Sequence, residues 1–346
     1  MRAFSELQRF VYSFHMSRSK TIVPNIFKIF LHECLTLTWG NAPITLSRIA
    51  HPVWAGLTNI ATLPSILGLL KLDPFAQVNQ TETRFAFKYL TPDYLITGIS
   101  VEERAACFLH HYNRLHAAAP NHLLRRILLN DFTLCEITQD GYHFAITMSL
   151  SKPSHNEGEM SLRLLVNGEF VFLLSFTIVP GWVVNSNAKE TLLISRLQGA
   201  RGRFGLISLA TKTLHDVSPA SLLLAALQGV GMWFQIGDFA CVSSTRHRHS
   251  VDDQFTSVLE SAYDSFFTAL GLRRSPAGFF VSPIPMTEKP LSLIKKGHKI
   301  RTKEKRMFKR EVQLACAESL EKGCECPDAE RVELPIKSRS SHAACY

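Results

Sequence analysis

The hydrophobic positions between residues 142 and 178 alternate with polar or small ones, and this pattern predicts an antiparallel meander. Apolar side chains occupy every second position over 142–150, 160–166 and 170–178, which is the period of a half-buried strand. Asn167-Gly168 separates the last two segments, and this dipeptide favours tight two-residue hairpin turns. We therefore expect three consecutive strands joined by short connections.

The pattern after residue 190 changes to alternating strands and helices. Strands are expected over 191–197, 239–242 and 279–281, and helices over 206–214, after Ser218-Pro219, and over 255–270. This alternation implies parallel or mixed strand pairing. The predicted fold class is α+β or α/β, with an antiparallel meander that continues into a mixed sheet with flanking helices.

Helices are expected before the meander. Ser100 and Glu103 form a capping-box pattern in front of an apolar stripe at Val101, Ala105, Phe108, Leu109, Tyr112 and Leu115, which predicts a helix there. Residues 1–80 alternate apolar stretches with prolines and favour short helices, including 26–37 and a broken helix over 51–72.

Four parts follow from this pattern in a chain of 346 residues. They are a helical N-terminal segment (1–80), a main α/β domain (81–290), a basic helical arm (291–320) and a disordered tail (321–346). A composition of 46% hydrophobic and 19% charged residues is that of a globular protein.

The net charge of +9 is concentrated in one segment. Ten Lys or Arg residues against two Glu lie between Lys289 and Glu311. Such a segment could bind anionic lipid or nucleic acid, or it could be a solvated helix face. Phe308 is the only Phe, Tyr or Trp in the run from Lys295 to Arg310. Stacking on nucleic-acid bases therefore has little support, and a membrane surface is preferred to RNA as the partner. The residues assigned to anionic-surface binding are Lys295, Lys296, Lys299, Lys303, Lys305, Arg306, Lys309 and Arg310.

We expect the protein to be cytoplasmic. The basic arm could in addition attach it peripherally to the inner membrane. The first thirty residues lack the pattern of a secretory signal, and no apolar run reaches the length of a spanning helix. Eight cysteines are scattered, four of them among apolar neighbours typical of reduced core thiols. Cys324 and Cys326 form the only close pair, so no metal site is predicted.

The strongest candidate for ligand binding is a Gly/Arg-rich turn between a predicted strand and a predicted helix. Backbone N–H groups at such a junction can hold a phosphate, and the residues proposed for it are Gln198, Gly199, Arg201, Gly202, Arg203 and Gly205. The alternative is a structural Gly-rich connection. The layout is similar to the acetyl-CoA-dependent N-acyltransferase fold, but that fold's signature would need Gly at Arg201 or at Phe204, so its pyrophosphate site is not matched.

Two histidines are weak catalytic candidates. His111 lies at the edge of the apolar stripe, where it could act as a base with His110 or simply cap the core face. His247 and Asp252 have the H-x4-D spacing of glycerolipid acyltransferases, a spacing that chance also produces among 14 histidines. No G-x-S-x-G, P-loop, G-x-G-x-x-G or H-E-x-x-H motif occurs, and no cofactor is identified.

Several separated segments resemble the VirK/YbjX family of Gram-negative bacteria. They lie in order between residues 85 and 312: Phe87–Leu90, Phe108–Tyr112, Phe172–Ile178, Leu197–Gly202, Leu214–Pro219, Tyr263–Phe266, Gly278–Phe280 and Lys305–Arg310. The resemblance implies a domain of unknown function linked to envelope stress, antimicrobial-peptide resistance or virulence-factor expression, with no reaction to carry over.

Three hypotheses follow. The first is an accessory protein that docks at the inner leaflet, and the second is an acyltransferase-like enzyme that uses an acyl-CoA or acyl-carrier donor at the Gly/Arg turn. The third, RNA binding, is weaker.

Overall fold

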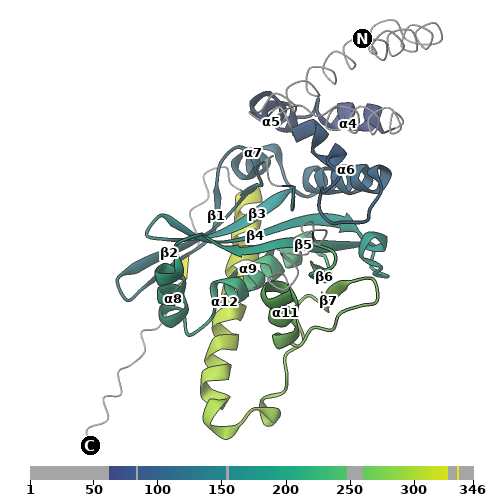
Figure 1. Cartoon of the computed structure of the whole chain (residues 1–346). Helices are drawn as coiled ribbons and strands as arrows, with labels where there is room; N and C mark the ends of the chain where they lie inside the picture. Colours follow the sequence, from purple (N-terminus) through teal and green to yellow (C-terminus); the bar gives the residue numbers. More distant parts are fainter. Residues whose placement is uncertain (1–61, 83–84, 153–155, 248–259, 326–332, 335–346) are drawn as a thin grey trace, which may run out of the picture. The chain divides into compact units, whose positions relative to one another are not determined.

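The computed structural model describes residues 62–82, 85–152, 156–247, 260–325 and 333–334. Their centre is a mixed eight-stranded sheet of order β7-β6-β5-β4-β3-β2-β1-β8 (Figure 1). The strands are β1 (Phe132–Gln139), β2 (Tyr142–Leu150), β3 (Met160–Val166), β4 (Glu169–Pro180), β5 (Glu190–Gly199), β6 (Asp238–Val242), β7 (Phe279–Pro283) and β8 (Glu333–Leu334).

Strands β2 to β4 confirm the predicted three-stranded meander, and the structure extends it to five antiparallel strands. β1, which the sequence analysis did not predict, pairs with β2, and β5 pairs antiparallel with β4. The β1–β2 and β3–β4 connections are Asp140-Gly141 and Asn167-Gly168, and all four residues have positive φ. Two consecutive positive φ values characterise the hairpin turn whose twist matches that of the flanking strands. The turn residues and the alternating pattern of the strands therefore both specify antiparallel hairpins.

The sheet becomes mixed beyond β5. Helices α8 (Phe204–Thr213) and α9 (Pro219–Phe234) lead from β5 to the parallel strand β6, and β7 returns antiparallel to β6. Between β6 and β7 lie a π-helical turn η3 (Glu260–Asp264) and α11 (Ser265–Ala269). The predicted fold class is thus confirmed.

Helices α9 and α12 (Lys299–Glu325) pack against each other beside the sheet (Figure 1). Ser218 caps α9, whose side chains are almost all buried. One face of the C-terminal half of α12 is buried too, through Val312, Cys316 and Leu320, and α12 contacts β1 as well as α9. The helix that begins in the basic segment therefore continues into the core of the domain.

The other helices lie N-terminal to the sheet in sequence. They are α4 (Leu63–Leu69), α5 (Phe75–Thr81), the 3-10 helix η1 (Phe85–Leu90), α6 (Val101–Ala118) and α7 (Asn121–Leu129). The predicted capping box of α6 is present in both directions, between Ser100 and Glu103. Short 3-10 helices η2 (Gly181–Val184), η4 (Leu291–Leu293) and η5 (Lys296–His298) complete the elements.

Some predicted elements lie wholly or partly outside the described residues. The predicted helix over 26–37 lies outside them, as does the beginning of the one over 255–270. In the segment assigned to a tail, α12 occupies residues up to Glu325, and β8 pairs parallel with β1. Cys107, Cys135, Cys241 and Cys316 are buried and unpaired, which confirms them as core thiols.

Candidate functional site

The Gly/Arg turn joins β5 to α8 and is tied to β4. The Ala200 N–H donates to the Val171 carbonyl at 2.9 Å, and the Arg203 N–H donates to the Ala200 carbonyl at 3.1 Å. Gly202 has a φ of +76°, a conformation that favours glycine. The Arg203 guanidinium lies 2.6 Å from the carboxylate of Glu169. Part of this turn therefore serves the fold itself.

The first residues of the turn line a groove of about 500 Å³ on the sheet, which we call the sheet groove. Its wall is formed by Gln198, Gly199, Ala200 and Arg201 together with Ser149, Leu150, Lys152, Ser161, Arg163, Phe170, Leu173 and Arg196. The structure thus brings three of the six predicted turn residues to a cavity. Gly202, Arg203 and Gly205 do not line it.

Strand register places the polar side chains of the sheet groove side by side. Ser149 of β2 is opposite Ser161 of β3, which is opposite Ser175 of β4, which is opposite Arg196 of β5. Neighbouring residues along each strand point to the other face, where leucine and phenylalanine form the core. The Ser161 hydroxyl lies 2.6 Å from that of Ser151 and 3.4 Å from that of Ser175. Ser149 and Ser161 therefore form a polar floor of the sheet groove, and Ser151 and Ser175 lie beside Ser161 outside its lining.

Among the described residues, those that line the sheet groove include four cations and no carboxylate. Arg196 donates to the side-chain oxygen of Gln198 at 2.9 and 2.6 Å and lies 3.5 Å from Glu157. Arg163 pairs with Asp131. Among the described residues, neither Lys152 nor Arg201 forms an ion pair, so the groove keeps two uncompensated positive charges.

The sequence pointed to the turn but not to the strand residues of the sheet groove. Ser149, Lys152, Ser161, Arg163 and Arg196 belong to three strands and a connecting segment, and no local motif joins them. The available signal was the polar half of each alternating strand, which a half-buried sheet ordinarily turns toward solvent.

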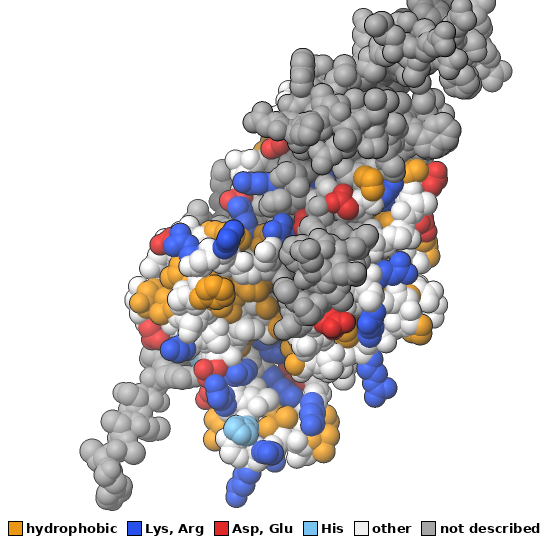
Figure 2. Space-filling view, in the orientation of Figure 1, with side chains coloured by type: hydrophobic (Ala, Val, Ile, Leu, Met, Phe, Trp, Pro, Cys, Tyr) orange, Lys and Arg blue, Asp and Glu red, His pale blue; other side chains and the backbone are white. Residues whose placement is uncertain are grey.

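The cations of the basic segment differ in exposure and in surroundings. Lys295, Lys296 and Lys303 are exposed around the start of α12, close in sequence to the exposed apolar side chains of Leu293 (65%) and Ile300 (75%). We call residues 291–303 the α12 tip. Figure 2 shows Lys, Arg and hydrophobic side chains gathered at this lower end of the molecule.

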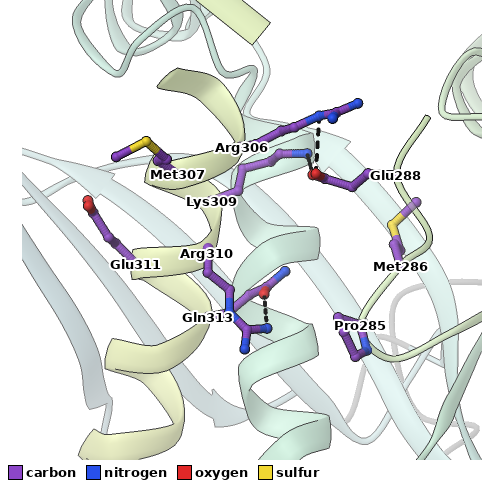
Figure 3. Close-up of a pocket in the computed structure, with 9 residues that line it drawn as sticks. All are labelled: Pro285, Met286, Glu288, Arg306, Met307, Lys309, Arg310, Glu311 and Gln313. Carbon is purple, nitrogen blue, oxygen red and sulfur yellow. Dashed lines mark hydrogen bonds and ion pairs between the residues drawn. The ribbon is translucent and has the colours of Figure 1, made fainter. Parts of the chain in front are cut away.

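Three of the remaining cations, Arg306, Lys309 and Arg310, line a second groove of about 490 Å³ between α12 and residues 285–288. Glu288 lies 3.1 Å from Arg306 and 3.7 Å from Lys309, between the two side chains (Figure 3). Burial lowers the pKa of Lys305, and the neighbouring charge of Arg301 lowers it further. The predicted cations are thus separated: Lys295, Lys296, Lys299 and Lys303 belong to the tip, and Arg306, Lys309 and Arg310 line a groove that already holds a carboxylate. Lys305 belongs to neither group.

His111 is fully buried and faces backbone rather than a cavity. Its Nδ1 accepts a hydrogen bond from the Ile178 N–H at 3.1 Å, at a point where β4 extends past the end of β3. Burial holds the pKa of His111 well below its ordinary value, and the charge of Lys88 lowers it further. A neutral imidazole that accepts a hydrogen bond from a strand N–H fits the alternative in which His111 caps the core face.

The buried neutral state of His111 predicts a pH-dependent stability. Its pKa is lowered on folding, so the unfolded chain binds the proton more readily, and the contribution is complete above pH 6.5 and lost as the pH falls below it. The expected loss approaches about 1.4 kcal/mol per pH unit well below pH 6.5 and totals about 1.4 kcal/mol between pH 7.5 and 5.5. The free energy of unfolding, measured with urea between pH 7.5 and 5.5, should change less with pH in His111→Gln than in the parent. The control His298→Gln, at an exposed histidine, should show the same pH dependence as the parent. Equal slopes for the parent and His111→Gln would contradict this assignment.

His247 is buried, and its ring centroid lies 4.9 Å from that of Tyr263. The Tyr263 hydroxyl accepts a hydrogen bond from the Leu197 N–H at 3.2 Å. Asp252, the other member of the predicted pair, lies outside the described residues. The described geometry accordingly shows the histidine packed on a ring beside β5.

A buried ionic cluster that the sequence analysis did not single out joins η1, α6 and the start of β3. The Lys88 ammonium lies 3.4 Å from the Glu159 carboxylate, with side chains 2% and 0% exposed. It also donates to the Gly158 carbonyl at 2.5 Å, and the Tyr112 hydroxyl donates to the other Glu159 oxygen. Burial raises the pKa of Tyr112 well above its ordinary value, and Glu159 adds to the rise. None of Lys88, Tyr112 and Glu159 lines either of the two grooves described above.

Among the residues that the structure describes, no three His, Cys, Asp or Glu side chains gather as metal ligands. No helix in the described part of the chain is both long enough and apolar enough to cross a membrane.

The fold and these surfaces define a class: an α+β protein with a mixed open sheet, a cationic groove on the sheet and a basic helix tip. The chain belongs to the DUF535 family of proteins of unknown function, whose model matches residues 54–315. That range covers the described helices and sheet from α4 into α12. No curated protein and no solved structure matches the chain significantly.

Proposed function

We propose that this chain is an accessory protein that attaches peripherally to an anionic membrane surface through the α12 tip. The observation that carries the proposal is the combination, in residues 291–303, of exposed lysines with the exposed side chains of Leu293 and Ile300. Lysines near an anionic bilayer each contribute about 1 kcal/mol. Aliphatic side chains can enter the boundary between headgroups and acyl chains.

The geometry favours docking by the tip rather than along the side of α12. Ile300, Met307 and Leu314 are exposed and spaced by seven residues, so they share one face of the helix. Glu304 and Glu311 lie between them on that face and are exposed, and carboxylates oppose contact with an anionic surface. Below residue 304 the charges of the tip are all positive.

The family and the resemblance support the biological setting of this proposal. The chain is a DUF535 protein, and its motifs resemble those of VirK/YbjX proteins. On that basis we propose an accessory role in envelope stress, antimicrobial-peptide resistance or virulence-factor expression, at the cytoplasmic side of the inner membrane of a Gram-negative bacterium. Attachment to an anionic leaflet would bring the protein to the envelope without a spanning segment.

Neutralising two tip lysines tests the attachment. Lys295→Gln with Lys296→Gln should weaken binding to vesicles of phosphatidylglycerol and phosphatidylcholine by about 30-fold, because two contributions of about 1 kcal/mol are lost. Cosedimentation at low salt measures the effect, and added salt should weaken binding by the parent. The control is Lys71→Gln with Lys189→Gln, two exposed lysines outside α12, which removes the same charge and should change binding little.

A second variant tests the apolar part of the surface. Leu293→Ser should weaken binding to the same vesicles without altering the salt dependence, because no charge is removed. Equal binding of the parent to neutral and anionic vesicles would reject the proposal. So would binding to RNA with no binding to anionic vesicles.

A further inference from the structure

The sheet groove has the composition of a small-molecule binding site, separate from the α12 tip. It joins three kinds of group: the cations Lys152, Arg163, Arg196 and Arg201, the hydroxyls of Ser149 and Ser161, and the apolar side chains of Leu150, Phe170 and Leu173. Pockets for small ligands typically combine an apolar wall with a few convergent polar groups. A volume of about 500 Å³ lies within the usual range of such sites.

The floor of this groove is polar where a sheet core would be apolar. Ser149 and Ser161, which line the groove, are at most 8% exposed, and Ser175 beside them is fully buried. Buried hydroxyl groups weaken a core unless they are hydrogen-bonded, and the bonds among Ser151, Ser161 and Ser175 satisfy them in part. Serine hydroxyls can also donate to the oxygens of a bound anion.

The positive charges around the floor indicate that it binds the anionic end of a ligand. Arg163 and Arg196 have carboxylate partners outside the lining, Asp131 and Glu157. The Nε of Arg163 is nevertheless buried without a hydrogen-bond partner among the described residues. Lys152 and Arg201 add two charges that no described carboxylate compensates. Two such cations beside hydroxyl donors match a doubly charged oxyanion.

The apolar wall indicates what the anion carries. The Phe170 side chain is 40% exposed although it belongs to β4, so one ring surface is available for contact. A phosphate alone would leave this wall unused. A phosphate attached to an aromatic or aliphatic group would cover it.

We propose that the sheet groove binds an organic phosphate, a phosphomonoester or diphosphate whose phosphate contacts Lys152 and Arg201 and whose organic part packs on Phe170. The turn contributes through Arg201 and the Gln198 side chain. The acyltransferase-like hypothesis is the special case in which the organic phosphate is an acyl carrier.

The test uses the full chain with four probes: pyrophosphate, ADP, coenzyme A and dihexanoyl phosphatidic acid below its micelle concentration. At least one of the three organic probes should bind by calorimetry at least tenfold more tightly than pyrophosphate. Arg201→Ala and Lys152→Ala should each weaken that binding by about tenfold, as expected when a hydrogen bond to a charged group is lost. Phe170→Ala should weaken binding of the organic probe and leave pyrophosphate unchanged.

The chain offers a matched control in Arg203→Ala. This arginine belongs to the same turn but pairs with Glu169 and does not line the sheet groove, so its loss should leave the affinity unchanged. Which organic probe binds identifies the source: a nucleotide, a coenzyme or a lipid headgroup. The proposal is overturned if no probe binds, if pyrophosphate binds as tightly as every organic probe, or if Arg203→Ala weakens binding as much as Arg201→Ala. Arg201 and Lys152 are exposed, so unchanged melting temperatures of the unliganded variants will establish that they fold.

Discussion

Replacing Lys88 by methionine is expected to lower the free energy of unfolding by about 3–5 kcal/mol, because it leaves the Glu159 carboxylate buried without a compensating charge. The two side chains are 2% and 0% exposed and their charged groups lie 3.4 Å apart. Burial lowers the pKa of Lys88, while the charge of Glu159 opposes that change. Urea unfolding at pH 7 measures the loss.

A double variant separates charge from packing. In Lys88→Met with Glu159→Gln the uncompensated carboxylate is gone, so the double variant should be more stable than Lys88→Met alone. If the single variant does not fold, the double variant still reports whether the loss is electrostatic. A cost below about 1 kcal/mol for Lys88→Met, or a double variant less stable than the single, would contradict this account of the cluster.

Replacing Gly229 by alanine should destabilise the protein by about 3 kcal/mol, at the upper end of overpacking costs. A Cβ at this position of α9 would lie 2.2 Å from the Gln313 carbonyl oxygen and 2.9 Å from the Cys316 Cβ of α12. The nearest atom belongs to the backbone of a 27-residue helix, so α12 as a whole would have to move. Urea unfolding is again the measurement.

The control is Gly205→Ala in α8, where a Cβ would meet nothing within 4 Å. There the substitution should be neutral or stabilise by up to about 1 kcal/mol, the difference in helix propensity between the two residues. Equal effects at positions 229 and 205 would show that α9 and α12 do not pack as closely as the structure has them.

Much of the fold is present in local sequence patterns. The period of two over residues 142–178 specified strands, the glycine-containing turns specified how they connect, and Ser100 with Glu103 specified the start of α6. Each signal acts over a few residues, because a side chain's direction in a strand and the satisfaction of a helix end depend on near neighbours. The fold class and the antiparallel meander could therefore be predicted.

The sites depend on contacts between residues far apart in the chain. Ser149, Ser161, Ser175 and Arg196 share a row only because of strand register, and a slip of one residue in any strand would turn its member to the other face. Within one basic segment, the fold exposes Lys295 and Lys296 and pairs Arg306 with Glu288, a division that composition alone does not contain.

The sequence by itself determined the strands from β2 to β7, the helix α6, the position of the basic segment and the Gly/Arg turn, but not α7 or β1. The tertiary structure alone decided which of these residues reach a cavity, which charges have partners, and that Lys88 is buried with Glu159 71 residues away in the chain. The physical reason is that burial and electrostatic compensation are properties of three-dimensional neighbourhoods, which form only when the sheet and the helices beside it come together.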